Sequence, residues 1–156
     1  MLKTNLNKIG GLSRNGRRLL LQSVLLLPFI HFALLLLGYY RLRRVMERLI
    51  SLKPSYAPVS ETEILQRARE IARIVSIAAQ HGLYKGTCLR RSLLFWWFLR
   101  REGIQSEICF GVRMFNRKLE AHAWVEYRGI VVNDSANVHE HYKALNDVFP
   151  PTKLGL

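Results

Sequence analysis

Cys88, His122 and Asp134 are the residue types of a nucleophile, a general base and a group that orients the base. The thiolate is the nucleophilic form of cysteine, and the free N–H groups at the start of a helix stabilise it. Imidazole accepts and returns protons, and a neighbouring carboxylate fixes its tautomer. Each residue also has an ordinary structural interpretation, as a small buried side chain, a strand histidine or a turn aspartate. Whether they act together depends on the fold.

The sequence predicts two helices around Cys88. Ser60 and Glu63 have capping-box spacing, and apolar residues then recur every three or four positions as far as Ala78, which predicts a helix over 61–81. A second helix begins near Thr87 and runs to Gly103. Apolar residues cover most of its circumference, so we expect it to be buried, with Cys88 in its first turn.

Period-two patterns then predict strands over 106–114, 120–127 and 130–134, with residues 115–119 as a turn. A three-residue loop ending at Gly129 would pair His122 with Asp134 on one face of the sheet. A two-residue loop would put Asp134 on the opposite face. Helices followed by a short antiparallel meander make an α+β domain.

The composition excludes several kinds of site. The chain has 156 residues, enough for one domain, and its 24 Lys and Arg against 11 Asp and Glu give a net charge of +13. This charge suits nucleic acid, anionic lipid or an acidic peptide as partner. Cys88 and Cys109 are too few for a disulfide scaffold or a four-cysteine zinc site, and His139 with His141 lacks a third ligand. No metal, cofactor or nucleotide site is expected, and Cys109 is expected to be inert.

An uncharged, mostly apolar run covers residues 19–40, between Arg18 and Arg41. It is long enough to cross a bilayer as a helix, although Pro28 is expected to kink or split that helix. Because basic residues flank the run on both sides, the positive-inside rule does not predict which end would face the cytoplasm. The sequence does not distinguish between three roles for this run: a membrane span, a helix on the membrane surface, or a helix packed on the domain or a partner. Prolines in Lys53–Pro58 predict a linker between a basic, Leu/Arg-rich helical segment (1–52) and the domain that follows (59–156).

Residues 86–134 closely resemble the leader peptidases of lasso-peptide biosynthesis, the microcin-processing family of transglutaminase-like cysteine peptidases. The matching motifs are Cys88-Leu89, Arg91-Ser92-Leu93, Leu99-Arg100-Arg101 with Gly103, Gly111-Val112-Arg113, Ala121-His122-Ala123-Trp124-Val125-Glu126, and Asp134.

The resemblance implies a transglutaminase-like, papain-like core in which Cys88, His122 and Asp134 form a catalytic triad. It also implies that the chain is the split, peptidase-only form, because the first 80 or so residues do not look like a leader-binding module. The expected partners are a lasso precursor peptide with its leader, a separate leader-recognition protein and a macrolactam cyclase. The expected location is the cytoplasm, where residues 19–40 either contact the inner face of the membrane or pack on protein, including these partners.

Arg90 and Arg91, beside Cys88, are candidates for substrate contact. Trp124 would line the cleft or shield the triad from water, unless it is an ordinary packed aromatic. The backbone N–H of Cys88 is one expected oxyanion donor. The competing hypothesis is a non-catalytic basic scaffold, bound to a membrane or to nucleic acid, in which the triad-like residues are structural; the peptidase hypothesis expects no nucleic acid.

Overall fold

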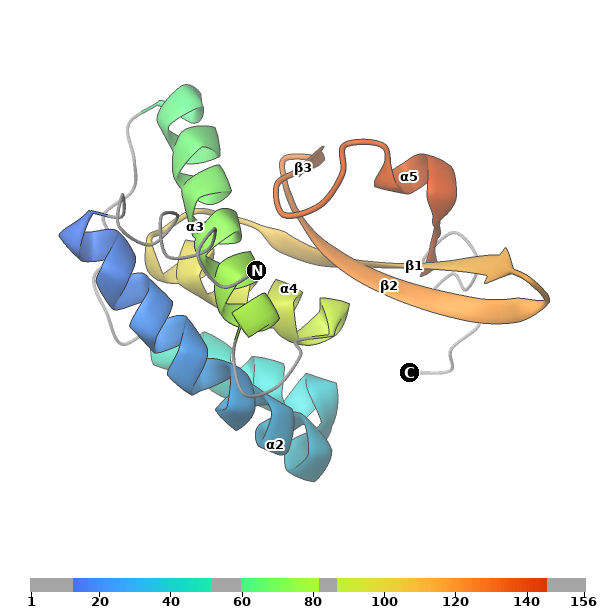
Figure 1. Cartoon of the computed structure of the whole chain (residues 1–156), viewed down its shortest axis with the longest axis horizontal. Helices are drawn as coiled ribbons and strands as arrows, with labels where there is room; N and C mark the ends of the chain where they lie inside the picture. Colours follow the sequence, from blue (N-terminus) through green and yellow to red (C-terminus); the bar gives the residue numbers. More distant parts are fainter. Residues whose placement is uncertain (1–12, 52–59, 82–86, 146–156) are drawn as a thin grey trace.

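The computed structural model describes residues 13–51, 60–81 and 87–145 of the chain (Figure 1). Its elements are α2 (Arg14–Ser51), α3 (Glu61–His81), α4 (Cys88–Arg101), β1 (Glu107–Phe115), β2 (Lys118–Tyr127), β3 (Ile130–Val131), α5 (Val138–His141) and β4 (Lys143–Ala144). The strands form one antiparallel sheet in the order β3-β2-β1-β4, which confirms the α+β class. The linker predicted at Lys53–Pro58 lies outside the described residues.

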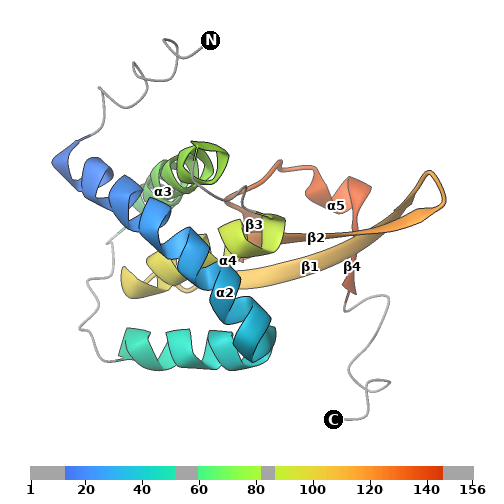
Figure 2. The same cartoon turned by 60° about the horizontal axis from the view of Figure 1, so that its bottom comes forward.

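The central element is α4, which contacts α2, α3, β1 and β2. Figures 1 and 2 show it between the other two long helices and the sheet. Its apolar circumference is buried as predicted, with Leu93, Leu94 and Leu99 fully inaccessible. The amphipathic helix predicted over 61–81 is α3, and the Ser60 hydroxyl accepts a hydrogen bond from the Glu63 amide at its start (3.3 Å).

The long apolar helix α2 packs its inner face on α3 and α4. Leu27, Ile30 and Leu42 are each only 3% exposed, so this face belongs to the hydrophobic core. The helix is not split at Pro28, one of the two outcomes predicted for that residue, but continues through it. Packing of the neighbouring Leu27 and Ile30 compensates for the missing amide of proline. The backbone leaves the helical conformation at Gly38 instead (φ 71°, ψ 172°), where glycine adopts a positive φ without steric cost.

Two tight turns set the register of the sheet. The β1–β2 turn has Asn116 and Arg117 at positive φ, so β2 begins at Lys118, earlier than predicted. The β2–β3 turn has Arg128 (φ 49°) and Gly129 (φ 79°) as its two central residues, the backbone expected of a type I′ hairpin. The predicted three-residue loop was therefore wrong.

The β1–β2 hairpin extends well beyond the helices (Figure 1), and its far end leaves Met114, Phe115 and Leu119 exposed. At the near end, Ala123, Val125 and Tyr127 alternate along β2 and are buried. A strand that packs one face on helices places the intervening residues on its other face. These are His122, Trp124 and Glu126.

Candidate active site

His122 and Asp134 are in direct contact. The Nε2 atom of His122 lies 2.7 Å from Oδ2 of Asp134, and their side chains are 18% and 24% exposed. A carboxylate at Nε2 holds the proton on that nitrogen and leaves Nδ1 to accept one. The second oxygen of Asp134 accepts a hydrogen bond from the Ser135 amide (2.8 Å), which fixes the carboxylate itself.

This contact forms by a route that the sequence did not predict. Glu126 pairs with Val131 and Tyr127 with Ile130, so a continued β3 would carry Asp134 to the face opposite His122. The strand instead ends at Val131. After Val132, whose amide still donates to the Val125 carbonyl (3.0 Å), the chain bends out of the sheet and returns Asp134 to His122.

The bend depends on Asn133. Its Oδ1 accepts the hydrogen bond of the Val125 amide (2.7 Å), which a longer β3 would have satisfied with a main-chain carbonyl. The chain can therefore leave the sheet while the Val125 amide keeps a hydrogen-bond acceptor. The sequence placed Asn133 inside the strand predicted over 130–134 and gave it no role of its own. The one available signal was an asparagine next to a candidate catalytic aspartate.

Cys88 is the first residue of α4 and is partly exposed. Thr87 precedes it in extended conformation and makes no side-chain cap, so the first amides of the helix lack a capping side chain. The described residues show no hydrogen bond between the Cys88 thiol and the His122 ring. One turn further along, however, Ser92 binds the carbonyl of Ala123, the residue after His122 (2.9 Å), which fastens this end of α4 to β2.

Aromatic rings pack around His122. Tyr142 stacks on it with ring centroids 4.8 Å apart, and Trp124 lies alongside at 6.2 Å. Trp124 is fully buried. Gly111, paired with His122 across the sheet, leaves the space that this ring occupies, since a Cβ there would lie 2.8 Å from it. The aromatic groups restrict the orientation of the imidazole.

The three candidate substrate-contact residues lie in different surroundings. Arg90 and Arg91 are both half-exposed in the first turn of α4, and Arg91 lines a small cavity with residues of α3 and with Asn133. Trp124 packs beside His122, and its indole N–H donates to Glu126 (2.5 Å). In this structure the Trp124 ring supports the site from inside.

Cys109 is a poor nucleophile. Burial, together with the nearby carboxylate of Glu126 and a hydrogen bond to it, raises the pKa of its thiol to about 12. It therefore stays a neutral hydrogen-bond donor at physiological pH. Glu126 also binds His139 (2.9 Å), so it satisfies three polar neighbours on this face of the sheet.

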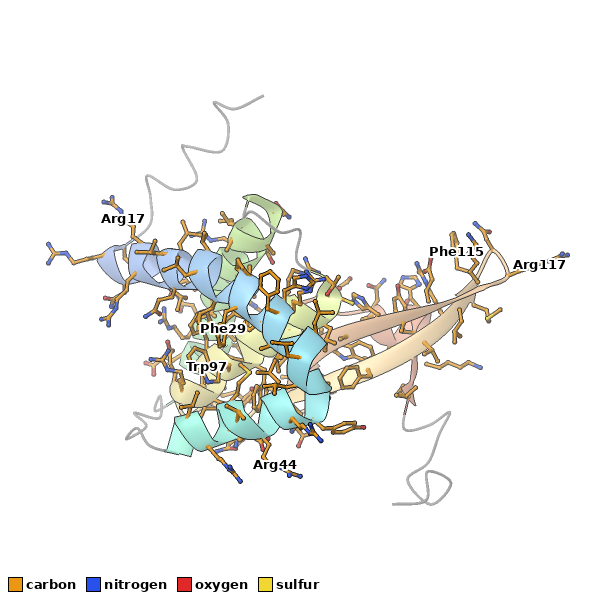
Figure 3. All side chains as sticks on the ribbon, turned by 90° about the horizontal axis from the view of Figure 1, so that it is seen from below. Arg17, Phe29, Arg44, Trp97, Phe115 and Arg117 are labelled. Carbon is orange, nitrogen blue, oxygen red and sulfur yellow. The ribbon has the colours of Figure 1, made fainter. Side chains whose placement is uncertain are left out.

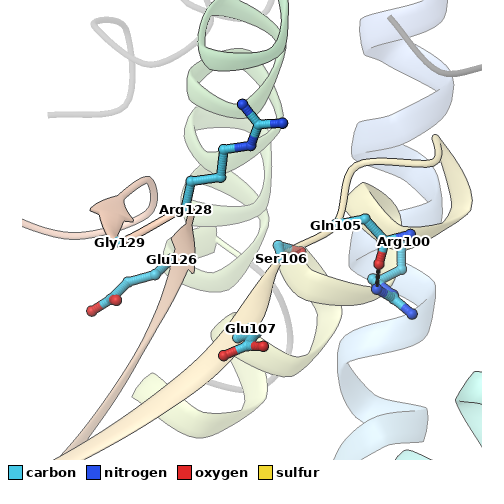
Figure 4. Close-up of a pocket in the computed structure, with 7 residues that line it drawn as sticks. All are labelled: Arg100, Gln105, Ser106, Glu107, Glu126, Arg128 and Gly129. Carbon is cyan, nitrogen blue, oxygen red and sulfur yellow. Dashed lines mark hydrogen bonds between the residues drawn. The ribbon is translucent and has the colours of Figure 1, made fainter. Parts of the chain in front are cut away.

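Two hollows of the described surface are lined by neither His122 nor Asp134. One of about 300 Å³, at the β2–β3 turn, is lined by Arg100, Glu107, Glu126 and Arg128 (Figure 4). Glu126 is four residues from His122 along β2, about 13 Å at the rise of a strand. Another, of about 520 Å³, is lined by residues of α2, β1, α5 and β4 and by Trp124 and Glu126 of β2. Among the described residues, no group of three metal-ligating side chains is present.

A cysteine at a helix start, tied to a strand whose histidine binds an aspartate from the next segment, can support acyl transfer through a thioester. Comparison with known families agrees with this chemistry. A model of the transglutaminase-like superfamily matches residues 32–147, well over half of the chain. No curated protein and no solved structure matched it. The chain belongs to the transglutaminase-like superfamily, which includes cysteine peptidases.

Proposed function

We propose that this protein is a cysteine peptidase that removes the leader peptide from a ribosomally made lasso-peptide precursor. The observation that carries the proposal is the 2.7 Å contact between His122 and Asp134. His122 lies on β2, which a hydrogen bond from Ser92 fastens to the helix that starts at Cys88. Membership of the transglutaminase-like superfamily supports the peptidase chemistry. The motifs of residues 86–134, which resemble those of lasso leader peptidases, support the choice of substrate.

The mechanism follows from the roles of the three side chains. His122 takes the thiol proton at Nδ1, and the Cys88 sulfur attacks the carbonyl carbon at the end of the leader. The Cys88 amide donates to the oxyanion. His122 then protonates the leaving amine of the core peptide, which leaves a thioester on Cys88. His122 next deprotonates a water molecule that attacks the thioester, and the leader departs as a carboxylate while the thiol regains its proton. Asp134 stabilises the imidazolium in both steps.

The partners in this proposal are a leader-recognition protein, which presents the precursor, and the cyclase that closes the macrolactam ring on the freed amine. The proposed location is the cytoplasm, at the inner face of the membrane. The outer face of α2 supports the location: Leu25, Phe29, Leu35 and Leu36 are 65–83% exposed on a helix whose other face is fixed in the core. By length and composition α2 could cross a bilayer, but here it packs on α3 and α4.

The test is mass spectrometry of the cognate lasso precursor, incubated with the protein and its recognition partner. We expect wild type and Cys109→Ala to release the leader, and Cys88→Ala and His122→Ala to release none. The Cys109→Ala variant is the matched control because it removes the other thiol. Cleavage by Cys88→Ala at the wild-type rate would contradict the proposal. Loss of cleavage in all variants and wild type alike, with leader binding intact, would favour the scaffold hypothesis.

A further inference from the structure

Ser92 and Asn133 form a buried side-chain bridge between α4, β2 and the segment after β3. The Ser92 hydroxyl donates to the Ala123 carbonyl (2.9 Å) and accepts from Nδ2 of Asn133 (3.0 Å). The other end of the same amide accepts from the Val125 amide (2.7 Å). Ser92 is 1% exposed, so both of its hydrogen bonds are shielded from water.

The bridge closes an edge of β2 that the short β3 leaves open. The backbone amide and carbonyl of Val125 face β3, where the Val132 amide reaches the carbonyl. In an antiparallel strand, every second residue turns its polar groups to the same edge, so the Ala123 carbonyl also faces this side. No strand residue of the described chain pairs with it there. Side chains of Ser92 and Asn133 take the places that a longer β3 would have filled.

Every member of the bridge adjoins one residue of the proposed triad. Cys88 lies one helical turn before Ser92, His122 immediately precedes Ala123, and Asp134 immediately follows Asn133. Residues four apart on a helix share a face, so the bond from Ser92 to β2 sets the distance between the start of α4 and the strand that carries His122.

We propose that Ser92 and Asn133 are positioning residues that hold Cys88, His122 and Asp134 in catalytic alignment across three separate elements. This inference rests on the proposed peptidase function. Ser92 sets the approach of α4 to β2, and Asn133 sets the bend that returns Asp134 to His122. Neither side chain takes part in the reaction.

The test measures how fast iodoacetamide alkylates Cys88 in the full chain across a range of pH, with peptide mapping to separate Cys88 from Cys109. We expect reactivity at neutral pH that depends on His122, since it requires a paired thiol and imidazole. Charged or titratable neighbours of His122 are Asp134 and Tyr142, with Arg113 over the Tyr142 ring. None of them is changed by the variants below.

Ser92→Ala and Asn133→Ala are expected to lower the neutral-pH alkylation rate about ten-fold, because misplacement of reacting groups by 1 Å costs up to about 100-fold. With the precursor, kcat should fall by a similar factor while KM stays within about two-fold. Ser106→Ala is the matched control, a serine that is 4% exposed and whose hydroxyl has no hydrogen-bond partner among the described residues. It should leave both quantities unchanged.

Ser92→Thr keeps the hydroxyl and adds a methyl group to a packed site, which costs stability. We expect a lower Tm with a wild-type alkylation profile, whereas a merely structural role would make activity follow Tm in every variant. Should Ser92→Ala fold poorly, Asn133→Ala and Ser92→Thr decide the question.

Wild-type alkylation profiles in folded Ser92→Ala and Asn133→Ala would overturn the positioning role. The proposed function fails by a different result, in which His122→Ala alkylates like wild type and Cys88→Ala still cleaves.

Discussion

At the scale of single residues, the two cysteines are distinguished by their surroundings. Cys109 has a pKa raised to about 12 by burial and by Glu126, so its thiolate becomes populated only as the pH rises toward that value. Cys88 is the first residue of α4 and is partly exposed, so a reagent in solution can reach its thiol. Between neutral and mildly alkaline pH, we expect iodoacetamide to modify Cys88 and to spare Cys109.

Peptide mapping by mass spectrometry measures this selectivity, and denatured protein provides the control because both thiols then react alike. Equal labelling of the two cysteines in the folded chain would show that the surroundings of Cys109 do not protect it.

Asp134 is expected to act through the tautomer of His122. Asp134→Asn keeps the shape of the side chain, but the Ser135 amide requires the remaining carbonyl oxygen, so the NH2 group faces Nε2. Two donors then oppose each other, which disfavours the tautomer with its proton on Nε2, and the imidazolium loses its counter-charge. The expected result is a fall in kcat of at least about 100-fold with little change in Tm, since such substitutions in triads cost up to about 10⁴-fold. Steady-state cleavage assays and thermal melts check it. An active Asp134→Asn protein would remove Asp134 from the mechanism.

At the scale of the elements, the sequence predicted what depends on local patterns. The helix over 61–81 and the buried helix that starts beside Thr87 both followed from periodicity and caps, and the structure confirms them. The strand register was not predictable, because Arg128 occupies a positive φ that its residue type disfavours. The loop length followed from that residue.

The candidate site shows the same division. Cys88 and His122 could be placed from local patterns, whereas the His122–Asp134 contact had been assigned to a strand pair that does not form. It arises from the bend at Asn133, and that bend depends on a hydrogen bond to a strand eight residues away. The same limit applies to α2, which continues through Pro28 and leaves the helical conformation at Gly38. Packing against α3 and α4 outweighs the low helix propensity of proline there.

The absence of a side chain at Gly111 on β1 makes room for two of the aromatic residues that pack around His122. A methyl group there would lie 2.8 Å from the buried Trp124 ring and equally close to Cβ of Tyr142, and both rings flank His122. We expect Gly111→Ala to lower the stability by about 1–3 kcal/mol, as overpacking does, and to reduce cleavage even well below its Tm.

Thermal melts and assays at low temperature separate these two effects. Gly129→Ala is the control, since φ is 79° there and nothing lies within 4 Å of the new methyl group. It should lose stability through the backbone alone and keep full activity. A Gly111→Ala protein with normal cleavage would show that His122 is held independently of Trp124 and Tyr142.

At the scale of the whole molecule, α2 has two apolar faces with different roles. The inner face completes the core, and the outer face carries large exposed side chains from Leu21 to Tyr40. Exposed arginines stand at both ends of this surface, among them Arg17 and Arg44 (Figure 3), while Glu47 is the one acidic residue between 13 and 51. The inner face of α2 is held in the core, so the helix can meet a bilayer only with its outer face. An exposed apolar face with basic residues at both ends is suited to the interface of an anionic bilayer.

The expected result is binding of the full chain to vesicles of phosphatidylcholine with phosphatidylglycerol, and weaker binding to phosphatidylcholine alone, because each arginine near an anionic surface contributes about 1 kcal/mol. Leu25→Gln with Leu36→Gln should abolish binding through loss of buried apolar area, with an unchanged Tm since both side chains are exposed. Leu119→Gln, at an equally exposed position on the hairpin, is the matched control and should bind like wild type. Co-sedimentation measures all three. Equal binding by the α2 double variant would assign the contact to another surface. If wild type binds neither vesicle, the outer face of α2 is a surface for a protein partner and the proposed membrane location is wrong. The proposed peptidase chemistry would be unaffected, because it rests on Cys88, His122 and Asp134.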